Sequence, residues 1–159
     1  MTDYDEVLVS LRRITRAIDL YSKKLLKDTG LTTSQLLVMQ SIGELENPTP
    51  SAIAKEVMLS QATVTNLIDR LERHQLVKRE RSLKDKRTVK VSLTDRGAEI
   101  IDSKPELLQT GFLRHYRKLQ EWERHGLVSA LQRVATMMDA EDLDASPILE
   151  LGELQSPPS

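Results

Sequence analysis

Residues 60–93, SQATVTNLIDRLERHQLVKRERSLKDKRTVKVSL, combine the pattern of an amphipathic helix with that of a basic β-hairpin. Apolar residues recur at i, i+3, i+4 and i+7 from Val64 to Leu71, which is the spacing of one helix face. Ser60 stands just before this run, where its hydroxyl can accept the free backbone N–H groups of the first turn. The pattern predicts a helix that begins after Ser60 and carries a polar outer face.

Two short strands are predicted after this helix, at Val77–Arg81 and Thr88–Leu93. Apolar residues alternate with polar ones from Val89 to Leu93, which is typical of a half-buried strand. Residues 82–87 form a polar turn between the strands. Nine Lys/Arg and four Asp/Glu give residues 61–90 a net charge of +5, whereas the whole chain carries −1. We call residues 77–93 the wing, and its local excess of positive charge indicates a polyanionic partner.

A second, shorter helix is predicted immediately before the first. Thr49 can cap it and Pro50 suits its first position, and its apolar residues run to Val57. Only residues 58–60 separate it from the next helix, which makes the pair a helix-turn-helix. The outer face of the second helix offers amide, hydroxyl and guanidinium groups, which can read base edges and hold phosphates. These residues are Gln61, Thr63, Thr65, Asn66, Arg70 and Arg73.

The N-terminal part predicts a long helix over residues 5–28, ended by Gly30. Its apolar residues are spaced by alternating steps of four and three, which is the seam of a coiled coil and indicates a partner helix. They are Val7, Leu11, Ile14, Ile18, Tyr21 and Leu25. Thr32 and Gln35 form a capping box that begins the next helix, which is expected to reach about Glu44.

The C-terminal part predicts a helix from Thr94 that Pro105 kinks or breaks near Lys104. A last helix is expected at 121–138, with its apolar residues facing inward. They are Trp122, Leu127, Leu131, Val134 and Met138. Residues 139–159 contain six acids and no base, which predicts a weakly structured acidic tail. Its apolar residues could still dock locally; they are Ile148, Leu149, Leu151 and Leu154.

Composition excludes several classes of protein. The chain has no cysteine, so disulfides, thiolate catalysis and cysteine-ligated zinc are excluded. The three histidines have no ligand partners at metal-binding spacing, and no motif of a phosphate loop, nucleophile elbow or catalytic carboxylate pair occurs. We therefore expect no metal, no cofactor and no enzymatic activity. The acidic first residues and the absence of a long apolar run predict neither a signal peptide nor a membrane span, and they fit a cytoplasmic location.

The order of these elements resembles that of the MarR family of bacterial transcription regulators, over about residues 5–140. The resemblance is most specific over residues 49–97. The wing motif Asp-x-Arg is present at 85–87 and the Leu-Thr-x-x-Gly motif at 93–97. Gln75 departs from the family pattern, because members usually turn on Gly there. Residues 6–26 are also similar to those of MarR-type regulators of compatible-solute (ectoine and betaine) genes.

This resemblance implies a mainly α-helical fold with a small β-wing. Residues 31–97 would form a winged helix-turn-helix DNA-binding domain, residues 1–30 and 98–140 a helical dimerisation region, and 141–159 the acidic tail. Two subunits would bind one pseudo-palindromic operator in double-stranded DNA. The implied DNA-binding residues are Ser60, Gln61, Ala62, Thr63, Thr65, Asn66, Arg70, Lys84, Asp85, Lys86 and Arg87. The dimer would use Val7, Leu11, Ile14, Ile18, Leu131, Val134 and Met138.

Repression is the family expectation, and many relatives carry an effector cleft between the dimerisation helices and the winged domain. Here Arg16, Tyr21 and Met39 would line it, and a small molecule or a change in ionic strength would relieve binding. The alternative is a winged helix that binds another protein and no DNA. Such a module would expose apolar residues over 60–70, where this chain places Gln, Thr, Asn and Arg.

Overall fold

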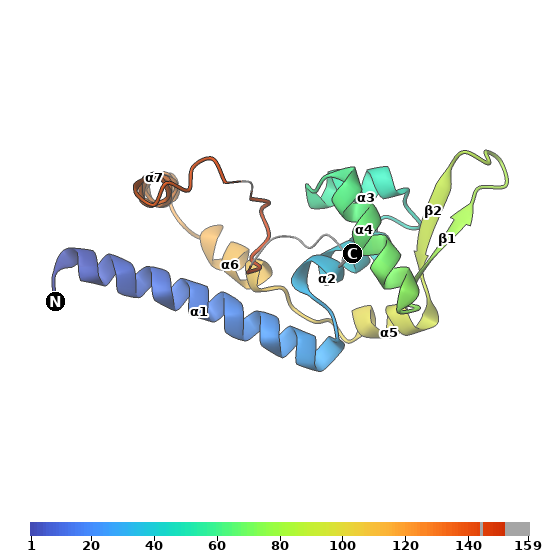
Figure 1. Ribbon diagram of the computed structural model, residues 1–159, viewed down its shortest axis with the longest axis horizontal. Helices are drawn as coiled ribbons and strands as arrows, with labels where there is room; N and C mark the ends of the chain where they lie inside the picture. Colours follow the sequence, from blue (N-terminus) through green and yellow to red (C-terminus); the bar gives the residue numbers. More distant parts are fainter. Residues whose placement is uncertain (144, 152–159) are drawn as a thin grey trace. The chain divides into compact units, whose positions relative to one another are not determined.

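A computed structural model of the chain describes residues 1–143 and 145–151. Within them the chain is mainly helical, with one antiparallel two-stranded hairpin, as Figure 1 shows. The elements are α1 (Asp3–Thr29), α2 (Thr33–Glu44), α3 (Pro50–Val57), α4 (Gln61–Arg73), β1 (Val77–Arg81), β2 (Val89–Leu93), α5 (Asp95–Asp102), α6 (Leu108–Tyr116) and α7 (Glu121–Met137). This order confirms the predicted fold class.

The helices begin and end where the capping residues predict. The Ser60 hydroxyl accepts the backbone N–H of Thr63 at 3.1 Å, so the expected cap of α4 is formed. Thr32 and Gln35 make the expected capping box of α2. Gly30 ends α1 in the left-handed conformation, with φ of 73°, and donates its N–H to the carbonyl of Leu26. These boundaries follow from local hydrogen bonding and need no distant contact.

The core lies among α2, α3, α4 and the hairpin (Figure 1). Leu36, Ile53, Ile68 and Leu71 are almost fully buried, and Val91 covers them from β2. The hairpin pairs Arg79 with Val91, and the Val91 N–H turns away from β1 to the carbonyl of Pro48 at 2.8 Å. The helix-turn-helix is therefore held against the wing by a shared apolar core and by the hydrogen bond from Val91 to Pro48.

The Leu-Thr-x-x-Gly motif joins the wing to α5 by close packing. The Thr94 hydroxyl caps α5 through the Gly97 N–H at 3.1 Å and donates to the Gln75 carbonyl at 2.7 Å. A Cβ on Gly97 would lie 2.1 Å from the carbonyl oxygen of Leu76, so only glycine fits. Gln75 adopts φ of 60°, a left-handed conformation that favours glycine. The turn expected from the family pattern thus persists although the glycine is replaced.

Pro105 separates α5 from α6, as predicted. Helix α5 ends at Asp102, and Lys104 takes a left-handed conformation with φ of 52°. Helix α6 then begins at Leu108. The break follows from the ring of Pro105, which clashes with a preceding helical turn and removes a backbone donor.

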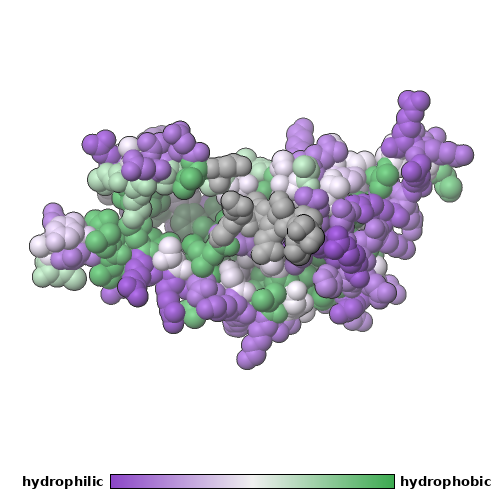
Figure 2. Space-filling model, viewed as in Figure 1, coloured by the Kyte–Doolittle hydropathy of each residue, from purple (hydrophilic) through white to green (hydrophobic). Residues whose placement is uncertain are grey.

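The described residues divide into two compact units, one of residues 1–105 with 148–151 and one of residues 106–147. The expectation that the apolar side chains of α7 face inward is wrong for this chain taken alone. Trp122 is 75% exposed, Leu131 54% and Met138 57%. Hydrophobic side chains also reach the surface along α1 (Figure 2). Within residues 1–143 and 145–151, these apolar side chains of α1 and α7 remain at least partly exposed.

The acidic tail lies partly outside the described residues, at 144 and 152–159, and Leu154 is among these. Residues 139–143 and 145–147 contain turns and no long element. Ile148 and Leu149 are half-buried and belong to the unit that contains the winged helix. Local docking of this segment was the alternative left open by its apolar residues; Ile148 and Leu149 follow that alternative, whereas Leu151 is 46% exposed.

Candidate nucleic-acid interface

The outer face of α4 presents a polar surface above a fully apolar inner face. Val64, Leu67 and Ile68 are buried in the core, which fixes the rotation of the helix about its axis. The predicted contact residues therefore lie on the outside. Ser60, Gln61 and Ala62 are exposed, and Thr63, Thr65, Asn66 and Arg70 are half-buried. This arrangement leaves hydroxyl, amide and guanidinium groups available at the first three turns of the helix.

The wing extends beyond the helices with its basic turn at the tip (Figure 1), and its surface in Figure 2 is mainly hydrophilic, although Leu83 in the turn is fully exposed. Lys84, Asp85, Lys86 and Arg87 are all exposed. The Asp85 carboxylate accepts the backbone N–H of Arg87 at 3.0 Å and the hydroxyl of Thr88 at 3.3 Å. Asp85 thus shapes the turn through the backbone of Arg87 and leaves the guanidinium of Arg87 in solvent. This contact gives a physical reason for the Asp-x-Arg motif.

Not every cation of the basic segment is available to a partner. Arg79, counted above with the basic residues, forms ion pairs with Asp69 at 2.5 Å and Glu72 at 3.1 Å. Lys78 forms an ion pair on its own strand, with its Nζ 3.3 Å from Oε1 of Glu80. Sequence reasoning missed the Arg79 pairs, because they join residues ten and seven positions apart across two elements. The exposed cations that remain around the polar face are Arg73, Arg81, Lys84, Lys86, Arg87 and Lys90.

The predicted dimerisation residues lie along α1 and α7 and at the end of α7, and all of them reach the surface. Val7 is 45% exposed and Ile14 is 50% exposed. Leu11, Ile18 and Val134 are half-buried. Apolar side chains at this spacing form the unpartnered seam that the sequence predicts. Their role in a dimer stays a prediction.

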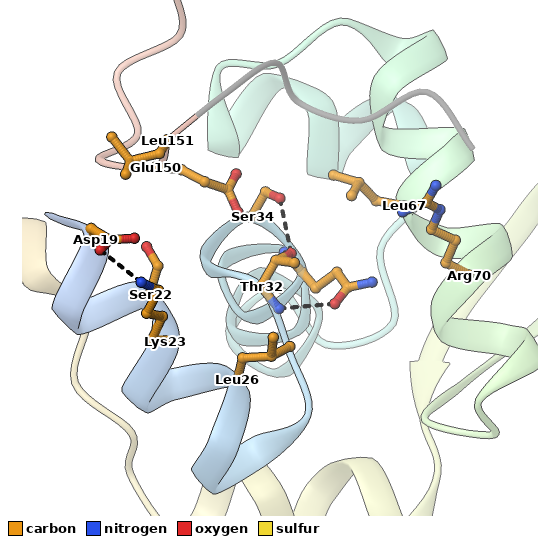
Figure 3. A pocket seen from close by; sticks show the side chains of 11 residues that line it. Asp19, Ser22, Lys23, Leu26, Thr32, Ser34, Leu67, Arg70, Glu150 and Leu151 are labelled. Atoms are coloured by element: carbon orange, nitrogen blue, oxygen red, sulfur yellow. Dashed lines mark hydrogen bonds and ion pairs between the residues drawn. The ribbon is translucent and has the colours of Figure 1, made fainter. Parts of the chain in front are cut away.

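The effector role of Arg16, Tyr21 and Met39 stays a prediction, and none of the three lines the pocket of Figure 3. Arg16 is exposed, Tyr21 half-buried and Met39 fully buried in the core. The structure instead has a pocket of about 200 Å³ between α1, the start of α2, α4 and residues 150–151 (Figure 3). Its lining includes Ser22 and Lys23 of α1, Thr32 at the N-cap of α2, Gln35 of α2, Leu67 and Arg70 of α4, and Glu150 and Leu151. The pocket therefore reaches the helix that carries the candidate contact residues.

No cluster of three or more His, Cys, Asp or Glu side chains in residues 1–143 and 145–151 could hold a metal ion. In that same part of the chain, no helix is both long enough and apolar enough to span a bilayer.

Comparison with known proteins places the chain in a family. The MarR family model matches residues 31–89. The HTH-type transcriptional regulator SarZ of Staphylococcus epidermidis is 32% identical over 111 residues, which are 70% of this chain and 74% of SarZ. The crystal structure of Streptococcus pneumoniae FabT in complex with DNA has a TM-score of 0.55 at 23% identity, covering 86% of this chain and 98% of FabT. The structure of reduced AbfR bound to DNA has a TM-score of 0.51 at 27% identity, covering 86% of this chain and 94% of AbfR.

The chain belongs to the MarR family. The family resemblance deduced from the wing and the Leu-Thr-x-x-Gly motif is thereby confirmed. Members of this family regulate transcription and are not enzymes, in agreement with the class predicted from the motifs. The likeness to regulators of compatible-solute genes stays a prediction.

Proposed function

We propose that the chain is a homodimeric repressor that binds a pseudo-palindromic operator in double-stranded DNA. The observation that carries the proposal is the pairing of a polar α4 face with an exposed basic wing in the same compact unit. Membership in the MarR family and the DNA bound in the similar structures of FabT and AbfR support it. A regulator of this kind acts on chromosomal DNA in the cytoplasm. Two-fold symmetry requires half-sites about one helical turn apart.

The two parts of the interface have different tasks in this proposal. We call the polar outer side of α4 over residues 60–70 the reading face. Its residues 60–66 lie at the start of α4, where Gln61, Thr65 and Asn66 contact base edges in the major groove. Arg70 and the wing lysines hold phosphates. Arg87 enters the minor groove, whose negative potential attracts a guanidinium. Ser60, Ala62 and Thr63 contact bases or nearby phosphates at the start of α4, where the Ser60 hydroxyl also caps the helix. Asp85 supports Arg87 through the turn of the wing.

The proposed dimer rests on the exposed seams of α1 and α7. Residues 1–30 and 98–140 are the proposed dimerisation region, and 31–97 the DNA-binding domain. Burying a single leucine or isoleucine side chain stabilises by roughly 1.5–3 kcal/mol, so several exposed residues of this type favour association. A symmetric dimer is also the simplest way to present two reading helices to one operator.

A small-molecule or ionic effector that relieves DNA binding is the least constrained part of the proposal. The pocket of Figure 3 supports it, because Arg70 is at once a proposed phosphate contact and part of the pocket lining. A ligand that holds Arg70 would withdraw it from DNA. Operator binding measured across a panel of small organic anions and a salt series tests this point.

The proposal is tested by fluorescence anisotropy with the duplex flanking the gene and with random duplexes. Arg87→Ala should weaken operator binding by about 1–3 kcal/mol, because one fully engaged guanidinium is lost. Asn66→Ala should reduce the operator-to-random ratio more than it reduces binding to random duplex. The apparent affinity should also fall with salt, by a slope of about −0.9 for each phosphate neutralised. Equal, weak binding to all duplexes would contradict the proposal.

A winged helix that binds protein without DNA is the second candidate. It requires an apolar surface on the outside of α4, where the structure presents Gln61, Thr65 and Asn66. The same anisotropy experiment separates the two functions, because a protein-binding module would show no operator preference at any salt concentration.

A further inference from the structure

Arg79, in the middle of β1, directs its guanidinium toward α4. Its Nη2 lies 2.5 Å from Oδ1 of Asp69, and its Nη1 lies 3.1 Å from Oε1 of Glu72. The side chain is only 25% exposed, whereas the two carboxylates are 41% and 42% exposed. An arginine held by two carboxylates uses both arms of its planar fork, a geometry that lysine cannot reproduce.

The backbone of Arg79 is tied to the same helix. Its N–H donates to Oε2 of Glu72 at 3.1 Å, so one carboxylate binds both the guanidinium and the backbone of one residue. This N–H points outward from the hairpin, because Arg79 and Val91 face each other while the Val91 N–H is bound to Pro48 on the other side. Glu72 therefore accepts a hydrogen bond from a backbone N–H on the outer edge of β1, which the pairing with β2 does not use.

The contacts follow one stripe of α4 that leads to the reading face. Asp69 and Glu72 lie four and seven residues after Thr65, and the Arg79 Nη2 makes a long contact of 3.5 Å with the Thr65 carbonyl. Asn66 is the next residue. In the other direction, β1 runs directly from Arg79 to the turn that holds Arg87. One side chain thus spans the two parts of the interface.

We propose that Arg79, Asp69 and Glu72 form a clamp that fixes the orientation of the wing relative to α4. The clamp lets Asn66 and Arg87 engage one DNA site together, and Arg79 is a positioning residue that does not itself contact phosphate. This inference rests on the proposed DNA binding and deepens it. It also assigns Asp69 and Glu72 a task in binding, although they are acids on a basic surface.

Simple electrostatics predicts the opposite result for the acids. Removing a carboxylate near the DNA makes the surface more positive and should tighten binding to any duplex. The clamp predicts that the same change weakens operator binding, because the wing loses its fixed position. A phosphate contact and a clamp also differ in salt dependence, since only a phosphate contact releases counterions.

The test uses the full chain, an operator selected by it from a random duplex library, and a random duplex as reference. Arg79→Met and Glu72→Met are compared with the control Arg81→Met, which removes an exposed cation two residues along the same strand. Affinity is measured over a salt series, and urea unfolding confirms that each variant is folded at the assay temperature.

Arg79→Met should weaken operator binding about tenfold and leave the salt slope unchanged. A tenfold change lies within the range of interaction energies between residues in contact. Glu72→Met should weaken operator binding as well, and the double variant should be no weaker than Arg79→Met. Both single variants should lower the operator-to-random ratio. Arg79→Lys should restore binding only in part. The control Arg81→Met should reduce the magnitude of the salt slope by about 0.9 if that side chain meets a phosphate, with the ratio retained.

The outcomes separate this inference from the proposed function. If the wild-type chain binds operator and random duplex equally, the proposed function fails first. If the wild-type chain discriminates, but Arg79→Met reduces the salt slope and Glu72→Met tightens binding, the clamp is overturned. Should Arg79→Met fail to fold, Glu72→Met on the helix surface decides alone, since tighter operator binding contradicts the clamp and weaker binding supports it. A loss of stability with an unchanged operator-to-random ratio would show a structural role only, and would also overturn the clamp.

Discussion

The winged region, residues 31–97, and the helices that follow it bury their apolar residues to very different degrees. In the winged region Leu36, Ile53 and Ile68 are almost fully buried. In α6 and α7, both of which lie within the described residues, no side chain is buried. Apolar burial is the main favourable term in folding, so the winged region contains its own source of stability. Helix α7 has the apolar residues but not the surface that would cover them.

This difference gives the two regions opposite sensitivities to substitution. A close-packed core tolerates no added atom without strain, whereas an uncovered helix accepts one freely. The uncovered helices should instead respond to anything that changes association between two chains.

Gly97→Ala should destabilise the chain by about 3 kcal/mol, the upper range for overpacking, because the new Cβ would meet the Leu76 carbonyl oxygen at 2.1 Å. Gly126→Ala in α7 is the matched control, since nothing lies within 4 Å of its Cβ. In the control, the free energy of unfolding should rise by about 1 kcal/mol, because alanine has a higher helix propensity than glycine. Urea unfolding followed by circular dichroism measures both. Equal effects of the two substitutions would show that the two regions are packed alike.

Leu131→Lys should weaken the proposed dimer by about 2 kcal/mol, because a leucine that is 54% exposed in one chain loses its apolar burial in the pair. Ser129→Lys adds the same charge to the same helix at an exposed polar position. Sedimentation over a dilution series gives the dissociation constants. The emission of Trp122, the only tryptophan, should shift to longer wavelength as the dimer dissociates. A monomeric wild-type chain at all concentrations would contradict the proposed dimer.

Gln75→Gly should stabilise the winged region by about 1 kcal/mol. Gln75 has φ of 60°, a conformation that costs an L-residue about 1–2 kcal/mol. Glycine removes this cost, but its greater conformational freedom in the unfolded chain offsets part of the gain. Gln75→Ala keeps the left-handed cost and should give no gain. The two unfolding midpoints are compared in urea. If alanine stabilises as much as glycine, the turn is not strained.

Local chemistry explains which features the sequence predicts. The caps at Ser60 and Gly30 and the break at Pro105 depend on neighbouring residues, so each is visible in the chain itself. The ion pairs of Arg79 depend on how β1 packs on α4, and the charge count alone included that residue in the positive excess of the segment. The exposed face of α7 was also out of reach, because helical periodicity identifies an apolar face but not what covers it. The DNA-binding role of residues 60–70 and 84–87 stays a prediction.

The smallest effect concerns the first turn of α1, far along the chain from the winged region. The side chain of Thr2 donates to Asp5 at 2.7 Å and its backbone N–H at 2.9 Å, which lowers the pKa of Asp5 below the ordinary value of 3.8. A lowered pKa in the folded state stabilises the turn above the ordinary value, and this stabilisation is lost as the pH falls through the lowered one. Acidification below about pH 4 should therefore fray this turn first.

Carbon chemical shifts of residues 3–6, recorded by NMR from pH 6 to pH 2, follow that fraying. The reference is Asp5→Asn, which removes the titrating group and keeps a side chain of the same size. In the wild-type chain the helical shifts should decline in acid, whereas in the variant they should start lower and change less. Because Asp3 and Glu6 are present in both chains, only the difference between the two profiles reports on Asp5. Identical profiles would show that the hydrogen bonds from Thr2 do not hold the start of α1.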